Sequence, residues 1–492
     1  MPTAPGQPAA PDSPTGQLAS WIADFTLETA PPVVRERAMH LILDGLGCAL
    51  VGARLPWSAT AVEAATALEG AGDALLIGWD ATTSLPGAAL LNGTFIQGFE
   101  LDDFHPGAPL HSNSLILPAL LSAARLAPAR LAPAADGARF LAAVIIGYET
   151  GPRVGLALHG AEMLTRGWHS GSVFGTLAAA AAVANFLGLD AAAVEDALGL
   201  GATQSFGLMA AQFGAMSKRM HHGMAARNGL YAAVLARGGY TGIKQVFEQP
   251  YGGWLSTFGE GHDPDPAQVT SELGNRWETQ SIVVKQYAAM GGLHTALDIL
   301  FQIAATRPLK AGEIDRIDVD LAESVYNHGG WAAQRPLTPT GAQMNIAYVL
   351  AAALIDGDAL MDQFTPDRIN RDDVWDLIPK ITARHDPAFD SPGGDGQTRL
   401  RIHFTDGSDL ESYQFAARSH QTPLSNAEIV TKYRHLTRGV IEPDRQDRLE
   451  RAVLTIDQQP SLEPLANLLA GAVVPPFTVQ PAASLSPSGT IA

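Results

Sequence analysis

Four short segments of this chain carry the residue types that acid–base and carboxylate chemistry require. The first segment spans residues 100–112 and contains three acids and two histidines: Glu100, Asp102, Asp103, His105 and His111. Such a cluster can perform general acid–base work or bind a metal, although its spacings match no standard metal-ligand signature. Its loop of Pro and Gly would aim His111 into a cleft. The structural alternative is a helix start capped by Asp102 or Asp103, with the histidines in solvent.

The second segment, Gly-Trp-His-Ser-Gly-Ser at 167–172, opens a long Ala-rich helical pattern. A helix N-terminus offers unpaired backbone N–H groups and the positive end of the helix dipole, and both suit a carboxylate. His169 would add a proton donor there. In the structural alternative Ser170 caps the helix and His169 only packs. The residues do not form a Gly-x-Ser-x-Gly elbow, so a serine hydrolase finds little support.

The third segment, residues 216–222, gathers positive charge in a chain whose net charge is −18. Lys218 stands near Gly and Met residues, where an ammonium group can hold a carboxylate or stabilise an enolate as its charge develops. If the run is helical, His222 lies one turn beyond Lys218, whereas Arg219 turns away toward solvent. A wholly solvated helix face is the alternative.

The fourth segment places Lys285 directly after the apolar pair Val283 and Val284. Lys285 would then point into a cleft between two domains, or reach solvent as a lysine at a strand end. In the first case it joins Lys218 as a second cation for an anionic substrate.

Composition excludes several classes of function. The 492 residues are 46% hydrophobic and 17% charged, which describes a well-buried globular protein of more than one domain. The acidic balance argues against nucleic acid and anionic membranes as partners. A single cysteine, Cys48, rules out an intramolecular disulfide and a multi-thiolate metal site, and its apolar neighbours indicate a core residue. The N-terminus lacks the basic start of a secretory signal, and the uncharged stretches 170–189 and 197–216 are Ala-rich rather than Leu-rich. We therefore expect a cytoplasmic protein without a membrane span.

The elements that must position these segments fall into two kinds. Apolar residues recur at helical spacing from about residue 17 to 257. Beyond residue 277, two stretches alternate apolar and polar residues as half-exposed strands do, 314–321 and 398–407, and helical patterns return at 425–436 and 445–456. The sequence therefore predicts a mostly α protein with a large helical domain from both chain ends (17–277 and 417–480), a smaller inserted α+β lid domain (278–416), and disordered tails (1–16 and 481–492).

The four segments, in this order, resemble the MmgE/PrpD family, which includes 2-methylcitrate dehydratases and cis-aconitate decarboxylases. The likeness extends from about residue 17 to 469 and is nearest to the fungal type of decarboxylase. The segments that carry it are 41–45, 51–58, 100–103, 108–112, 167–169, 195–199, 218–229, 251–253 and 374–377. Two positions depart from the family pattern. Glu100 stands where Asp is common, and Phe104 stands where some decarboxylases carry a hydroxyl residue, so a polar substrate contact is lost.

The resemblance implies the same two-domain fold, a homodimer, and an active site between the domains that uses neither a metal nor an organic cofactor. By position it implies catalytic roles for five residues: Asp102, His111, His169, Lys218 and Lys285. Four residues are expected to bind the substrate: Glu100, Asp103 and Tyr326, together with His222, which helical spacing places near Lys218.

The implied substrate is a small di- or tricarboxylate that reacts through a carboxylate-stabilised carbanion or enolate. With cis-aconitate, loss of CO2 places charge on the enolate of a distant carboxylate, so cations must stabilise it and one acid must protonate carbon to give itaconate. The same groups could epimerise an amino-dicarboxylate such as iminodisuccinate, or dehydrate a 2-methylcitrate-like hydroxy acid. Two alternatives lie outside this class: a non-catalytic carboxylate-binding protein, and a metal-dependent hydrolase that uses Asp102, Asp103, His105 and His111.

Overall fold

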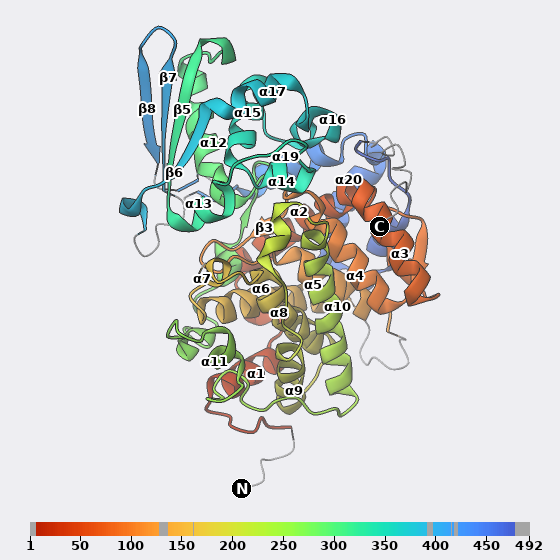
Figure 1. Ribbon diagram of the computed structural model, residues 1–492. Helices are drawn as coiled ribbons and strands as arrows, with labels where there is room; N and C mark the ends of the chain where they lie inside the picture. Colours follow the sequence, from red (N-terminus) through yellow and green to blue (C-terminus); the bar gives the residue numbers. More distant parts are fainter. Residues whose placement is uncertain are drawn as a thin grey trace, which may run out of the picture.

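A computed structural model describes residues 6–126, 136–160, 162–390, 397–414, 416–417 and 422–477. The chain forms a large helical body and a smaller domain that carries a four-stranded sheet (Figure 1). The predicted fold class, mostly α with a small α+β part, is confirmed.

The helical body is organised around one fully buried helix, α8 (Ser170–Leu187). Four helices pack directly against α8: α5 (Asn113–Ala123), α6 (Gly137–Leu156), α9 (Ala191–Ala202) and α10 (Ser217–Arg237). Small residues allow these helices to approach closely. A Cβ atom at Gly229 of α10 would lie 2.4 Å from the Cβ of Ala179 on α8. The Ala/Gly-rich composition of this region is therefore a packing requirement.

A second contact of α10 brings it to the site described below. On its other side α10 packs against α4 (Leu85–Ile96), and a Cβ at Gly223 would lie 1.9 Å from the Leu90 carbonyl oxygen. No side chain fits at this crossing, so the start of α10 is fixed against the segment that follows α4.

The C-terminal end of the chain returns to the helical body. Helix α19 (Asn426–Thr437) and helix α20 (Pro443–Leu454) both pack on α2 (Pro32–Gly52), as Figure 1 shows. The contact includes an ion pair of 2.7 Å between Lys432 Nζ and the fully buried Asp44 Oδ1. Helix α21 (Glu463–Ala470) follows α20 and touches strand β1 (Ala74–Leu76). The expected helices at 425–436 and 445–456 are confirmed.

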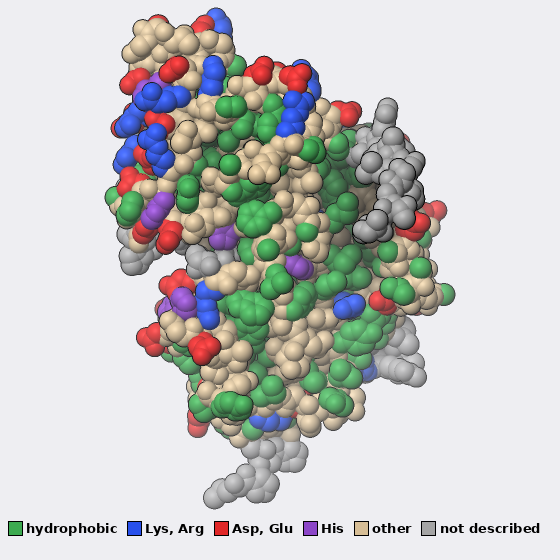
Figure 2. Space-filling view, viewed as in Figure 1, with side chains coloured by type: hydrophobic (Ala, Val, Ile, Leu, Met, Phe, Trp, Pro, Cys, Tyr) green, Lys and Arg blue, Asp and Glu red, His purple; other side chains and the backbone are tan. Residues whose placement is uncertain are grey.

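The smaller domain contains a sheet in the strand order β6-β5-β7-β8. Its strands are β5 (Ile314–Leu321), β6 (Ile381–His385), β7 (Thr398–Phe404) and β8 (Asp409–Gln414). Strand β5 runs parallel to β6 and antiparallel to β7, and β8 is antiparallel to β7. Helices α12 (His294–Thr306) and α15 (Ile346–Asp356) cover one face. Charged side chains gather over the exposed part of the sheet, for example the pair of Arg401 and Glu411 (Figure 2).

Two predicted boundaries need correction. Residues 278–284 belong physically to the helical body, because the amides of Glu278 and Thr279 donate to the buried Glu149 carboxylate at 3.0 and 2.9 Å. Residues 6–16, expected to be part of a disordered tail, are ordered: the Ala9 amide donates to Glu195 Oε2 at 2.8 Å, and Ser13 caps α1 (Pro14–Asp24). Residues 1–5 and 478–492 lie outside the described residues.

Several short elements complete the described chain. The helices are α3 (Pro56–Glu69), α7 (Glu162–Thr165), α11 (Trp254–Phe258), α13 (Glu323–Gly329), α14 (Pro339–Gln343), α16 (Pro366–Ile369) and α17 (Asp372–Leu377), and β1 pairs with β2 (Ala81–Thr83). By length and apolar composition α8 could cross a membrane, as could α2 and α3 if that bent pair were one span. Since other helices bury almost all of α8, it has the environment of a core helix. Cys48 is buried in α2, as expected.

Candidate active site

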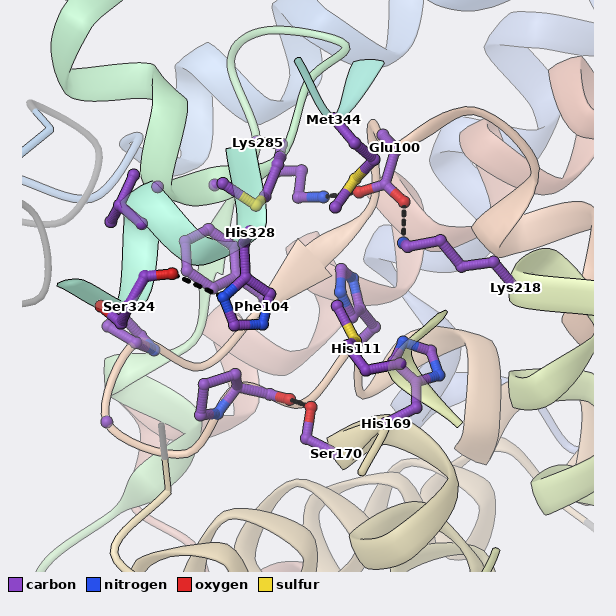
Figure 3. Close-up of a pocket in the computed structure, with 18 of the residues that line it drawn as sticks. Glu100, Phe104, His111, His169, Ser170, Lys218, Lys285, Ser324, His328 and Met344 are labelled. Atoms are coloured by element: carbon purple, nitrogen blue, oxygen red, sulfur yellow. Dashed lines mark hydrogen bonds and ion pairs between the residues drawn. The ribbon is translucent and has the colours of Figure 1, made fainter. Parts of the chain in front are cut away.

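A cavity of about 320 Å³ lies where the helical body meets the smaller domain. From the helical body it is lined by Glu100, Phe104, His111, His169, Ser170, Met209 and Lys218, and from the second part of the chain by Lys285, Met290, Ser324, Val325, His328 and Met344. Figure 3 shows the side chains that it labels, among them Glu100, His111 and Lys218, arranged around a common space. Five of the predicted site residues therefore share one cavity: Glu100, His111, His169, Lys218 and Lys285.

A small two-stranded ribbon brings Lys285 to Glu100. Strand β3 (Asp103–Phe104) pairs antiparallel with β4 (Val283–Val284), so the residues that flank these strands become neighbours although they are far apart in sequence. Lys285 Nζ lies 2.5 Å from Glu100 Oε2, and both side chains are buried. Glu100 itself has a left-handed backbone (φ 57°), a conformation that costs a non-glycine residue energy and that often marks functional sites.

The first turn of α10 supplies two more cations to the same carboxylate. Lys218 Nζ pairs with Glu100 Oε1, and Arg219 Nη1 lies 2.6 Å from that oxygen. The expectation that Arg219 faces solvent is wrong, because its side chain is only 1% exposed. Its guanidinium also donates to Gln343 of α14, so the smaller domain covers the side of the helix that would otherwise be solvated.

The charges at this end of the cavity shift the pKa values of its groups. Burial acts to raise the pKa of Glu100, but Lys218, Lys285 and Arg219 together hold it well below its usual range. Burial lowers the pKa of Lys218 to about 8, against the opposing effect of Glu100. Three cations surround one carboxylate, which leaves a net positive charge of two. We call these four residues the cationic pole, and it suits an anionic ligand.

His111 is oriented by two buried acids. Its Nδ1 lies 3.1 Å from Oδ2 of the fully buried Asp102, which leaves Nε2 for a ligand in the cavity. Asp103 does not reach the cavity; its carboxyl group accepts the backbone N–H groups of Ser112 and Asn113 at 2.9 and 3.1 Å. Burial, and then the charge of Asp102, raises the pKa of Asp103 well above its usual value. Asp103 therefore holds the loop that carries His111 and does not line the cavity, where we expected it to bind substrate.

His169 sits at the N-terminus of α8 within a cluster of imidazoles. Its Nδ1 lies 3.0 Å from His221 Nδ1, and its ring stacks on that of His222 with the centroids 5.1 Å apart. Burial, and then the charge of Lys218, lowers the pKa of His169 well below its usual value and lowers that of His221 to about 4. His169 and His221 are therefore neutral at pH 7. His221 was missed, although helical spacing places it three residues from Lys218 on the same face.

His222 packs against His169 but does not line the cavity. The expectation that His222 binds substrate is therefore not met. Its Nδ1 lies 2.8 Å from Ser114 Oγ, and it is fully buried. The segment 167–172 contains Gly171 for a steric reason: a Cβ there would lie 2.1 Å from His222 Nε2.

Tyr326 does not line the cavity either. Its ring faces His385 of β6, 6.5 Å away between centroids. Helix α13 instead presents Ser324, Val325 and His328 to the cavity, because positions four apart share a face of a helix whereas position 326 points elsewhere. His328 is thus a site residue that the sequence analysis did not select.

The four side chains that a metal-dependent hydrolase would use as ligands contact different residues. His105 Nε2 lies 3.2 Å from Glu278 Oε2, Asp103 accepts backbone amides, and Asp102 pairs with His111. Within the described ranges, no group of three or more His, Cys, Asp and Glu side chains is arranged to hold a metal ion.

Comparison with known proteins agrees with this geometry. Residues 16–267 match the MmgE/PrpD N-terminal domain, and residues 287–458 match the MmgE/PrpD C-terminal domain. The chain belongs to the MmgE/PrpD family. It is 43% identical over 468 residues to the cis-aconitate decarboxylase-like protein oryM of Aspergillus oryzae, an alignment that covers 93% of this chain and 97% of that protein. Identity is 38% to the cis-aconitate decarboxylase of Aspergillus terreus (92% and 95% covered) and 26% to that of Homo sapiens (78% and 79% covered).

Proposed function

We propose that this protein is a carboxy-lyase that decarboxylates a small di- or tricarboxylate, in the manner of a cis-aconitate decarboxylase that forms itaconate. The observation that carries the proposal is the cationic pole beside the pair of Asp102 and His111, both at one cavity. The names of the fungal and human relatives support the same reaction.

Substrate binding uses the cationic pole. Each lysine ammonium has three N–H donors, of which one contacts Glu100, so Lys218 and Lys285 retain donors for a substrate carboxylate. Glu100 holds both ammonium groups in place before substrate arrives. Because the site is buried, the attraction between these cations and developing negative charge is stronger than it would be in water.

The reaction then needs one bond broken and one proton added. The C–C bond to the departing CO2 breaks, and its electron pair forms a new C=C bond. The electrons of the original double bond move to the carbon next to the distant carboxylate, where the lysines stabilise the resulting enolate.

His111 is the best placed acid to protonate that carbon. Asp102 contacts His111 Nδ1 and orients the ring, so Nε2 is the ring nitrogen left to transfer a proton to the substrate. His169 has a pKa well below its usual value and acts as a neutral hydrogen-bonding group. Transfer of the proton from His111 completes the reaction without any further group.

Proton NMR in D2O tests this function with four substrates: cis-aconitate, an alkyl-substituted cis-aconitate, 2-methylcitrate and iminodisuccinate. We expect itaconate and CO2 from cis-aconitate, or the corresponding product from a close homologue. Recovery of substrate with deuterium and inverted configuration at the carbon next to a carboxylate would establish an epimerase instead. Alkene formation from the hydroxy acid would establish a dehydratase, and a panel without any change would overturn the reaction class.

A further inference from the structure

The cavity has two chemically different ends. One end is the cationic pole, and the other is a wall of three apolar side chains: Phe104, Met290 and Val325. Figure 3 shows Phe104 on the opposite side of the cavity from Lys218, with His328 and Ser324 beside it. We call Phe104, Met290 and Val325 the apolar wall.

Close packing builds the apolar wall. A Cβ on Gly291 would lie 3.1 Å from the Phe104 ring, so the ring rests directly on a backbone without a side chain. A Cβ on Gly292 would meet Val325 at 3.0 Å and the end of Met290 at 3.4 Å. The wall is therefore in contact with the loop of the second domain and presents a fixed apolar surface to the cavity.

The charge distribution limits what can lie against this wall. Among the described residues that line the cavity, Lys218 and Lys285 are the lysines, none is arginine, and both lysines contact Glu100. His328 stands beside the wall, but burial lowers its pKa, so it is neutral at pH 7. A carboxylate at the wall would lose its hydration without gaining a lysine or arginine partner, whereas a hydrocarbon group would lose only unfavourable contact with water.

We propose that the preferred substrate carries an aliphatic substituent that packs on the apolar wall while its carboxylates bind the cationic pole. This inference rests on the proposed function and names its substrate class: an alkyl-substituted unsaturated di- or tricarboxylate rather than cis-aconitate itself. Burial of one methylene is worth about 0.8 kcal/mol, so each added methylene tightens binding about fourfold until the wall is covered.

Calorimetric binding of non-reactive saturated ligands to the full-length protein tests the inference. The ligands are succinate, methylsuccinate, ethylsuccinate and propylsuccinate, with propane-1,2,3-tricarboxylate as the tricarboxylate lacking an alkyl group. We expect Kd to fall about fourfold for each methylene, with a heat-capacity change that grows more negative as the chain lengthens. We also expect the tricarboxylate to bind less tightly than propylsuccinate.

Two variants test whether the apolar wall causes the dependence of Kd on chain length. Phe104→Ser removes the ring, whereas Val325→Thr changes polarity at nearly constant volume and so leaves no cavity. Both should flatten the dependence on chain length and leave the Kd of succinate within about twofold, because succinate needs only the cationic pole.

A wild-type Kd that is flat or rises with chain length would overturn the inference, as would tighter binding of the tricarboxylate than of propylsuccinate. Since these ligands do not react, the result is independent of the reaction. A steep chain-length dependence without CO2 release in the NMR experiment would overturn the decarboxylase and leave the apolar subsite standing.

Discussion

Replacing Glu100 by Gln should destabilise the protein strongly. Gln has nearly the same shape but no charge, so Lys218, Lys285 and Arg219 would remain buried together without the carboxylate that they surround. Removing one partner of a buried ion pair costs about 3–5 kcal/mol, mainly because a desolvated charge is left uncompensated. We expect a loss at the upper end of this range, since three cations share the one acid.

Differential scanning calorimetry at pH 7 measures this loss. Unfolding entropy near 60 °C is about 2.1 cal/mol/K per residue, or about 1 kcal/mol/K for a chain of this length, so 3–5 kcal/mol lowers Tm by about 3–5 °C. The matched control is Glu411→Gln. Glu411 is 48% exposed and accepts a hydrogen bond of 2.8 Å from Arg401 Nε, and exposed pairs of this kind contribute about 1 kcal/mol or less.

A dicarboxylate ligand sharpens the experiment, because it supplies the negative charge that the variant lacks. Saturating propylsuccinate should therefore raise the Tm of Glu100→Gln more than that of the wild type or of Glu411→Gln. Equal Tm losses for Glu100→Gln and Glu411→Gln would refute the reasoning, since they would mean that the three cations do not depend on Glu100.

Three further predictions concern catalysis. First, kcat/KM should fall as the pH rises through about 8, because the pKa of Lys218 is lowered to about 8 and its ammonium form is lost above that pH. Glu100→Gln removes a charge that raises the pKa of Lys218, so the variant should lose activity at a lower pH than the wild type. An unchanged pH profile in Glu100→Gln would contradict the assignment to Lys218. Asp102→Asn should lower kcat about 10²- to 10⁴-fold with little change in KM in a CO2-release assay, and a change confined to KM would show that His111 is not the acid. Finally, His221→Asn removes the contact between the His221 and His169 rings, so the His169 ring is less firmly positioned and kcat should fall about 10- to 100-fold. Unchanged 15N shifts of the His169 ring in this variant would contradict the positioning role of His221.

The sequence predicts local elements better than the contacts between them. Helix α6 (Gly137–Leu156) lies in the stretch from residue 17 to 257 that was expected to be helical, because apolar periodicity is a local property. The contact of Lys285 with Glu100 depends on a ribbon between strands about 180 residues apart, so residue type could single out both residues but no local pattern could pair them.

The two clearest errors in the site concern the direction in which a side chain leaves its helix. Arg219 was expected in solvent because helical spacing turns it from Lys218, but the second domain closes over that face and Gln343 contacts its guanidinium. Tyr326 was expected in the site, but α13 turns His328 inward instead. The expectation for Arg219 came from helical spacing and that for Tyr326 from the family resemblance, and neither contains information on which face of the helix meets the other domain.

The most direct test of the account is the position of deuterium in the product formed in D2O. The cationic pole is proposed to stabilise an enolate, and His111 to protonate the carbon next to the distant carboxylate. Proton NMR of itaconate, or of its alkyl homologue, should therefore show one deuterium in the methylene group and none in the vinyl group, and His111→Asn should abolish its formation. Deuterium in the vinyl group, or product formation at an undiminished rate by His111→Asn, would contradict the account.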